Sequence, residues 1–345
     1  ADQNYRKFAS LGDPALKFAL PELSVITDSI NNTLLSNFTD TIKALNKVRI
    51  SGHVEDRLGQ NMSAFTGTLY ITVYDKKSSL NTLGTNLSSN SYPFQVWKNI
   101  IYKGKVSVNN GLFNTEFRVP KDISFEVGNA RISYYSENQE LDGSGFDESL
   151  LFGGIDSNAE IDEEGPQIKL FLNDENFVSG GLTNDQPLFR AKIFDENGIN
   201  TVGNGIGHDI EAVIDDDYSS SIIMNDYYES DLDTYKSGEI SYALSNLSVG
   251  EHKISLKVWD IYNNSSSEEL MFNVVEEEEI TIDKVLNYPN PFTTSTEFFF
   301  EHNQVCNFLD VSIQIFNVSG KVVKNINERI HNDGFRSSGI PWDGK

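Results

Sequence analysis

Residues 67–75 read GTLYITVYD, in which aliphatic residues alternate one by one with threonine and tyrosine before a closing aspartate. Side chains two positions apart in a strand lie on the same face, so this pattern predicts a strand with one apolar and one polar face. The same alternation returns in KVRISGHVED (47–56), GLFNTEFRVP (111–120), NARISYYSEN (129–138), LFRAKIFDENG (188–198), HKISLKVWD (252–260), STEFFFEHN (295–303) and VSIQIFNVSGK (311–321).

Turn-forming residues separate these stretches. Gly, Asn, Asp and Pro recur at intervals of about ten residues, and no helical crossover pattern lies between the strands. The sequence therefore predicts an all-β fold of tandem antiparallel, immunoglobulin-like β-sandwiches. Only residues 2–10 and 36–46 are compatible with a helix.

Composition excludes several classes of function. The chain has 345 residues, more than one compact core usually serves, and 38% are hydrophobic, enough to build several cores. A formal net charge of -24 without a basic stripe argues against binding to nucleic acid or to an anionic membrane surface. No apolar run is long enough to form a transmembrane helix.

Domain boundaries follow from prolines and acidic runs. A first short piece closes at Pro21, IDEEGP (161–166) predicts a solvated linker, and VVEEEEI (274–280) predicts a second one. The predicted units are the tail of an upstream domain (1–21), a β-sandwich (22–165), an immunoglobulin-like β-sandwich (166–275) and a C-terminal β domain (276–345).

The stretch DENGINTVGNGIGHDI (195–210) is rich in glycine and acid. Gly203, Gly205 and Gly207 read GxGxG, but the alternating, acidic HDIEAVIDDDY that follows argues against a dinucleotide loop, which needs a helix N-terminus. A turn between strands, whose glycines supply positive φ angles, is one interpretation.

Structural calcium is the alternative interpretation of this stretch, and it is the only cofactor that the sequence suggests. Hard cations favour oxygen ligands in carboxylate-rich loops, although the EF-hand spacing is absent. The candidate ligands are Asp195, Asn197 and Asp209, with Asp215, Asp216 and Asp217 further along the chain.

No catalytic constellation emerges from the residues. The single cysteine, Cys306, excludes internal disulfides and multi-cysteine zinc sites. His302 lies four residues before it, a separation of over roughly 10 Å along a strand, too far for a thiol and its general base. No GxSxG elbow and no HExxH helix is present.

Longer stretches carry a resemblance to a known family. LGDPAL (11–16) resembles the closing segment of gingipain-type cysteine peptidase domains. The glycine-rich 195–210, NDYYESDLDTYKSGEISYAL (225–244) and VGEHKISLKVWDIYNNSSSEELMFNV (249–274) resemble the region after that domain in the type IX secretion sortases of Bacteroidota. LNYPNPFTTSTEFFFEHN (286–303), IQIFNVSGKVV (313–323) and GIPWDGK (339–345) resemble the family's C-terminal secretion-type domain.

This resemblance implies a parent enzyme at the cell surface, associated with the outer membrane. Such an enzyme is a cysteine endopeptidase and transpeptidase that cleaves the C-terminal signal of cargo proteins and joins them to anionic lipopolysaccharide through a thioester. The catalytic His and Cys are expected before residue 1, and the C-terminal domain is expected to continue past residue 345, so this chain is expected to be inactive alone.

The resemblance also implies partners for an accessory, docking region. These are an outer-membrane β-barrel shuttle of the PorV type, other attachment-complex subunits and, through the parent enzyme, the C-terminal domains of cargo. Aromatic and proline-rich positions are the partner-binding candidates, against the alternatives of a rigid turn and a buried strand. They are Tyr288, Pro289, Asn290, Pro291, Phe292, Phe298, Phe299 and Phe300.

Two short stretches, DSI (28–30) and DTI (40–42), match an acceptor pattern for O-glycosylation, which makes Ser29 and Thr41 candidate modification sites. Helix capping is the alternative role for these residues. A different function also stays open for the whole chain: the all-β pattern and acidic composition equally suit a free-standing adhesin or carbohydrate-binding array. A peptidase domain encoded upstream would favour the sortase region, and a signal peptide there would favour the adhesin.

Overall fold

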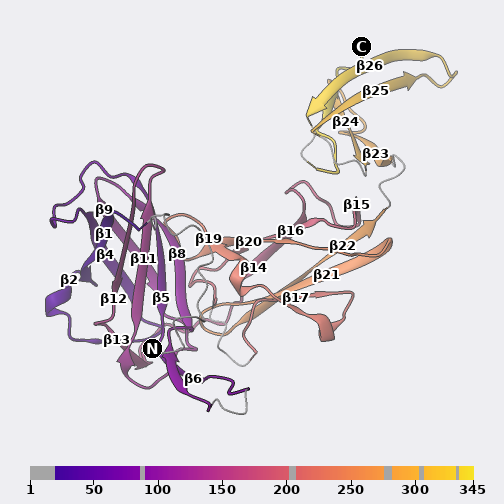
Figure 1. Ribbon diagram of the computed structural model, residues 1–345. Helices are drawn as coiled ribbons and strands as arrows, with labels where there is room; N and C mark the ends of the chain where they lie inside the picture. Colours follow the sequence, from indigo (N-terminus) through magenta and orange to yellow (C-terminus); the bar gives the residue numbers. More distant parts are fainter. Residues whose placement is uncertain (1–19, 86–89, 202–206, 276–281, 303–306, 332–333) are drawn as a thin grey trace, which may run out of the picture.

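The computed structural model describes residues 20–85, 90–201, 207–275, 282–302, 307–331 and 334–345. These residues form strands and three single 3₁₀ turns, η2 (Leu35–Asn37), η3 (Tyr218–Ser220) and η4 (Asn225–Tyr227), which confirms the all-β prediction (Figure 1). Each of the predicted alternating stretches forms a strand. Among the described residues, no helix is long and apolar enough to cross a membrane.

The first unit is built around one large, mainly antiparallel sheet with the strand order β8-β5-β11-β12-β1-β4-β9. Its outermost strands, β8 and β9, are joined by a tight turn at 109–111, so the sheet curls and brings its two ends together. The strands are β1 (Leu23–Ile30), β4 (Lys47–Glu55), β5 (Gly67–Tyr74), β8 (Ile100–Val108), β9 (Leu112–Arg118), β11 (Arg131–Glu137) and β12 (Asp142–Asp147), with β2 (Thr33–Leu34) paired to β1.

A smaller sheet and a hairpin complete this unit. The sheet has the order β10-β13-β3, from β10 (Gly128–Asn129), β13 (Leu151–Ile155) and β3 (Thr41–Ala44), and the hairpin pairs β6 (Ser78–Asn81) with β7 (Pro93–Val96). In β5 the aliphatic members Leu69, Ile71 and Val73 are fully buried, as the alternation predicts.

Residues 36–46, which are compatible with a helix in sequence, form no α-helix, and residues 2–10 lie outside the described residues. Residues 35–37 form a single 3₁₀ turn, and β3 pairs in parallel with β13. Ile42 and Ala44 are buried while Lys43 between them is exposed, so burial repeats every second residue and favours a strand.

The second unit is a sandwich of two sheets. One sheet has the order β14-β16-β20-β19 and the other the order β15-β22-β21-β17-β18. The strands are β14 (Gln167–Leu172), β15 (Gly181–Thr183), β16 (Leu188–Phe194), β17 (Glu211–Ile214), β18 (Ile222–Ile223), β19 (Tyr228–Ser230), β20 (Ser237–Ala243), β21 (Gly250–Trp259) and β22 (Ser265–Val274). Phe189 and Ile240 from one sheet share a core with Leu256 and Phe272 from the other.

A loop of the second unit covers the free edge of β8. The backbone N–H of Asp233 donates to the Lys105 carbonyl at 2.9 Å, and the Asp233 carboxylate accepts from the Ser107 N–H at 2.7 Å and from its hydroxyl at 2.6 Å. Tyr235 of the same loop packs against the core of the first unit. An edge strand that would otherwise expose unpaired backbone groups is thus occupied.

The glycine-rich stretch 195–210 forms a second contact between these units. Asp122 of the first unit accepts hydrogen bonds from Asn200 Nδ2 at 3.0 Å and Asn263 Nδ2 at 2.8 Å, and it contacts His208 Nδ1 at 2.7 Å. The turn interpretation holds for Gly198 and Gly207, which have φ of 109° and 88°. Gly203 and Gly205 lie outside the described residues.

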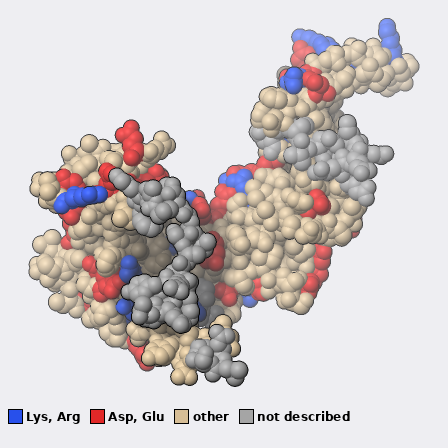
Figure 2. Space-filling view, viewed as in Figure 1, with Lys and Arg blue, Asp and Glu red and all other residues tan. Residues whose placement is uncertain are grey.

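The C-terminal unit contains a sheet of order β23-β24-β27 and a separate long hairpin. Its strands are β23 (Ile282–Tyr288), β24 (Thr296–His302) and β27 (Ile340–Trp342), with β25 (Phe308–Phe316) and β26 (Val322–His331) in the hairpin. Figure 1 shows this hairpin, in yellow, projecting beyond the second unit. Figure 2 shows carboxylates scattered over both larger units and no continuous stripe of Lys and Arg on this face.

His252 on β21 predicts a pH dependence of stability. Both ring nitrogens face acceptors, with Nδ1 2.7 Å from Asp215 Oδ2 and Nε2 2.7 Å from the Ser248 carbonyl. Burial opposes the charge, but these contacts outweigh it and raise the pKa of His252. The raised pKa means that the folded state binds the proton more tightly than the unfolded state does.

The stabilisation by His252 is therefore complete below about pH 6.5 and is lost as the pH rises through the raised pKa. We expect His252→Gln to lower the free energy of unfolding more at about pH 6 than at about pH 9, as measured by denaturant titration. An equal loss of unfolding free energy at both pH values would contradict a charged His252 in the folded state.

Candidate docking site

The proline-rich loop 288–292 connects β23 to β24 and lies on the surface. Both of its X-Pro bonds, Tyr288–Pro289 and Asn290–Pro291, are cis. The Thr296 hydroxyl donates to the Pro289 carbonyl at 2.9 Å and accepts from Asn287 Nδ2 at 3.2 Å. Tyr288 is 72% exposed, the largest exposure among the aromatic candidates.

The three phenylalanines of β24 divide between the two faces of its sheet. Phe298 stacks on Trp342 with ring centroids 6.1 Å apart, and Phe292 contacts the same indole at 5.5 Å. Phe299 points to the opposite face, because successive side chains of a strand alternate. All three phenylalanines of the run are half-buried, Phe300 included, so none is a freely exposed ring.

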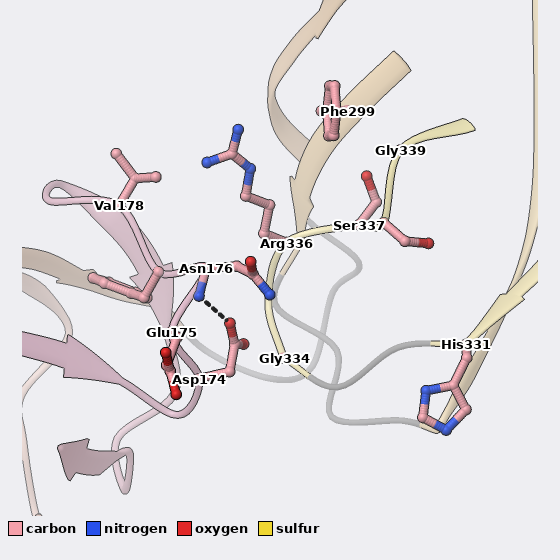
Figure 3. A pocket seen from close by; sticks show the side chains of 12 residues that line it. Asp174, Glu175, Asn176, Val178, Phe299, His331, Gly334, Arg336, Ser337 and Gly339 are labelled. Atoms are coloured by element: carbon pink, nitrogen blue, oxygen red, sulfur yellow. Dashed lines mark hydrogen bonds between the residues drawn. The ribbon is translucent and has the colours of Figure 1, made fainter. Parts of the chain in front are cut away.

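A cleft of about 590 Å³ lies between the second unit and the C-terminal unit (Figure 3). The Arg336 guanidinium extends into it and lies 5.6 Å from the centre of the Phe299 ring. The lining residues are Asp174, Glu175, Asn176, Phe177 and Val178 from the second unit, with Phe299, His331, Gly334, Arg336, Ser337, Ser338 and Gly339 from the C-terminal unit.

The two walls of the cleft touch at Asp174. Its carboxylate accepts the Asn176 N–H at 2.7 Å, and a β-carbon added to Gly334 would lie 1.6 Å from its Oδ2 atom. Lys284 adds a second link, since its Nζ donates to the Gly180 carbonyl at 2.9 Å. The cleft thus presents the Arg336 guanidinium beside an aromatic ring, with the carboxylates of Asp174 and Glu175 also in its lining.

Sequence reasoning found Phe299 but missed Arg336 and Asp174. The two walls come from stretches far apart in the chain, and neither stretch carries a motif for ligand binding. GIPWDGK was noted as part of a resemblance, but the stacking of its Trp342 on Phe298 depends on the pairing of β27 with β24.

The candidate glycosylation sites lie in sheets. Ser29 is in β1, opposite Leu34 and Ser51, and Thr41 begins β3 opposite Leu151. Both are half-buried. The alternative that these residues cap helices is wrong, and their glycosylation stays a prediction.

Three carboxylates, those of Asp162, Asp195 and Asp260, place oxygens within 4.8 Å of one another at the start of the second unit. Each has protein donors: Asp195 accepts the N–H groups of Asn197 and Gly198, and Asn197 Nδ2 donates to Asp162 at 2.7 Å. Of the calcium candidates, Asp195 and Asn197 lie here and Asp209 does not. Calcium binding stays a prediction.

The other acidic candidates have separate roles. Asp215 accepts from His252 and from the Lys253 N–H, and Asp217 accepts the Ser219 N–H at the start of η3. Asp216 forms an ion pair with Lys253 at 2.9 Å. These three side chains are therefore used within the second unit.

Asp195 gives a testable prediction. Burial, with a contribution from the neighbouring Asp260, raises its pKa to about 6, so the folded state holds a proton that the unfolded state releases near pH 4. Its contribution to stability consequently falls as the pH rises between these values. In EDTA, we expect the Tm of Asp195→Asn to rise relative to wild type on going from about pH 5 to about pH 7.5.

Calorimetry with and without calcium chloride distinguishes the mutual repulsion of the three carboxylates from metal binding by them. If calcium binds here, it raises the wild-type Tm at neutral pH and leaves Asp195→Asn unchanged, because bound ligand stabilises only the state that holds it. An unaltered wild-type Tm contradicts the calcium prediction, and an unaltered pH profile of the variant contradicts the raised pKa.

No protein-family model matches the chain, and comparison with curated proteins finds no match. Among solved structures, native α2-macroglobulin of Escherichia coli matches at 9% identity over 95% of this chain and 21% of that chain, with a TM-score of 0.26. Red sea bream transglutaminase matches at 8% over 74% and 32%, with a TM-score of 0.21. These two share too little with this chain to indicate a function.

A third solved structure shares far more sequence. Dimeric latent PorU from Porphyromonas gingivalis is 32% identical over 96% of this chain and 32% of that chain, with a TM-score of 0.48. This chain therefore spans about a third of the length of PorU. Along nearly its whole length, the chain is similar in sequence to a segment of PorU.

Proposed function

We propose that this chain is the accessory and docking region of a cell-surface type IX secretion sortase similar to PorU. The observation that supports this proposal is the 32% sequence identity to PorU, which extends over 96% of the chain and so includes all three units. The described residues of the resembling stretches 195–210, 225–244 and 249–274 belong to the second unit, and those of 286–303, 313–323 and 339–345 belong to the C-terminal unit. LGDPAL (11–16) lies outside the described residues.

In this proposal, peptide cleavage and the transfer of cargo to anionic lipopolysaccharide belong to the part of the enzyme that this chain does not match. The described histidines of the two larger units support that division. His53 contacts Asp28, His208 contacts Asp122, and His252 contacts Asp215. Each imidazole is thus held by a carboxylate, without a cysteine beside it in the described residues. Cys306 lies outside those residues.

The surface of the C-terminal unit supports a docking role. Among the residues of this unit that the structure describes, the buried apolar side chains are Ile330, Phe335 and Ile340, whereas many others are exposed. The exposed ones are Ile282, Val285, Leu286, Tyr288, Phe308, Phe316, Val318, Val322 and Val323. Apolar side chains gathered on so small a unit are typical of a surface that a partner covers.

The two faces of the β25–β26 hairpin differ at their centres. On one face, which we call the apolar face, Ile313 lies opposite Ile326 and Leu309 opposite Ile330. The other face is polar at its centre, where Ser312 lies opposite Asn327, and carries Phe308 and Phe316 at its ends. Ile313 and Ile326 are only half-buried. A two-stranded hairpin is marginally stable by itself, so a partner that covers the apolar face also stabilises it. We propose the PorV-like outer-membrane barrel as that partner.

Capture of the full chain by the purified barrel in detergent tests the proposal. We expect Ile313→Glu with Ile326→Glu to weaken capture at least about tenfold, because two buried carboxylates would oppose contact with an apolar surface. The matched control is Ser312→Glu with Asn327→Glu, which adds the same charge to the opposite face of the same strands.

Equal capture of both double variants would exclude the apolar face as the contact. No capture of the wild-type chain would refute docking to the barrel, and screening the chain against polysaccharides would then test the adhesin or glycan-binding alternative. Far-ultraviolet circular dichroism of each variant shows whether the substitutions leave the strands intact.

A further inference from the structure

The hairpin of β6 and β7 in the first unit leaves an apolar face open to solvent. Within the described part of the chain these two strands pair with each other alone, and Figure 1 shows β6 projecting from one end of the unit. Leu80 lies directly opposite Phe94, and the Thr82 N–H donates to the Tyr92 carbonyl at 2.9 Å. Because side chains two positions apart share a face, Leu80, Tyr92 and Phe94 lie together. We call these three residues the β6–β7 face.

The β6–β7 hairpin is amphipathic. The exposures of Leu80, Tyr92 and Phe94 are 37%, 73% and 43%, so the rest of the described molecule leaves all three open. The opposite face of the hairpin carries Ser79 and Gln95, which lie opposite each other in the register. A two-stranded hairpin is marginally stable in water by itself, so a surface that covers the β6–β7 face also stabilises the hairpin.

A neighbouring loop adds apolar side chains at the base of the hairpin. Lys76 Nζ donates to the Ser124 carbonyl at 2.9 Å, so the loop that follows Ser124 is held beside the start of β6. Phe125 and Val127 in this loop are 57% and 62% exposed, with the carboxylate of Glu126 between them. The apolar surface at this end of the first unit is therefore wider than the hairpin alone.

The charge of the sequence around the hairpin is opposite to that of the chain. Residues 76–115 contain no Asp or Glu, although the chain has 51 acidic residues and a net charge of -24. The charged residues of this run are Lys76, Lys77, Lys98, Lys103 and Lys105. Two of them, Lys76 and Lys105, form ion pairs with acidic residues outside the run. Lys77 and Lys98 flank the hairpin and are exposed, and Lys77 Nζ lies 4.9 Å from the centre of the Trp97 ring.

These features favour a lipid surface as the occupant of the β6–β7 face. Tyrosine and tryptophan are enriched at membrane interfaces, where an apolar face enters the headgroup region and lysines meet anionic headgroups. The net charge of -24 argues against such a surface for the molecule as a whole. At physiological salt, however, charges farther away than about 8 Å are largely screened, so the lysines beside the hairpin decide the local interaction.

We propose that the β6–β7 hairpin inserts its apolar face into the headgroup region of a bilayer that contains anionic lipid. Leu80, Tyr92 and Phe94 enter the boundary between headgroups and acyl chains, and Lys77 and Lys98 contact the anionic headgroups. This inference goes beyond the docking function, because it concerns a different unit and a lipid surface in place of a protein partner. It does not depend on the similarity to PorU.

Sedimentation of the full chain with lipid vesicles tests the proposal. The wild-type chain is expected to bind vesicles made of equal parts of phosphatidylcholine and phosphatidylglycerol. We expect Leu80→Ser with Phe94→Ser to lower the partition coefficient at least about tenfold, because two apolar side chains no longer leave water on binding. The matched control is Asn81→Ser with Gln95→Ser, which changes two residues of the opposite face of the hairpin and should bind as the wild type does.

A fluorescent probe identifies the face that enters the bilayer. Because Cys306 is the single cysteine, a nitrobenzoxadiazole group can be attached in a Cys306→Ser background through Phe94→Cys or, as the control, through Gln95→Cys. These two positions are adjacent in β7 and lie on opposite faces of the hairpin. We expect the anionic vesicles to raise the emission of the probe at position 94, and lipids with brominated acyl chains to quench it, with little change at position 95.

Lys77→Gln with Lys98→Gln measures the contribution of charge. We expect this variant to bind the anionic vesicles at least about fivefold more weakly than the wild type does, and to bind pure phosphatidylcholine vesicles equally well. Four results would each overturn the proposal: no binding of the wild type to anionic vesicles, equal affinity of the wild type for both kinds of vesicle, unchanged binding of Leu80→Ser with Phe94→Ser, or equal probe signals at positions 94 and 95. Far-ultraviolet circular dichroism shows whether each variant keeps its strands.

Discussion

A β-sheet has apolar faces and edges with unpaired backbone N–H and C=O groups. Water can form hydrogen bonds with the edge groups, but the apolar faces must be covered by other apolar side chains. The three units meet this constraint in different ways. The first unit curls one sheet until β8 and β9 meet, and its remaining edge at β8 receives Asp233 and Tyr235 from the neighbouring unit. The second stacks two sheets around a shared core. The C-terminal hairpin leaves one apolar face half-exposed, and this incomplete coverage is the physical basis for assigning it a partner.

Polar side chains, rather than a large apolar interface, join the two larger units. Asp122 collects contacts from Asn200, His208 and Asn263, which lie on two loops of the second unit, the β16–β17 connection and the β21–β22 turn. The apolar contacts of the junction are a small cluster of Leu45, Ile261 and Tyr262 and the packing of Tyr235 against the core of the first unit. A carboxylate can accept several hydrogen bonds at once only when each donor lies at a suitable distance and angle, so a shift of one unit relative to the other would break some of these bonds. The junction therefore specifies one relative orientation of the two units.

Much of the fold could be predicted from the sequence, because alternation with a period of two is a local property. GTLYITVYD and HKISLKVWD form strands where the pattern places them. Residues 36–46 were ambiguous in sequence because their short strand, β3, pairs with residues over a hundred positions away. The candidate sites were less accessible to sequence reasoning. Asp162 and Asp260 join Asp195 only after the strands pair, and Arg336 reaches the cleft only because two units meet there.

The loop that covers β8 also affects how the molecule carries force. Two units joined only by a linker would swing apart under a small pull, with the linker peptide taking the load. Here the bonds from Asp233 to Lys105 and Ser107 run between a loop and a strand edge, so a pull along the strands loads them together in shear. Under load, the two larger units would therefore move together as one rigid lever.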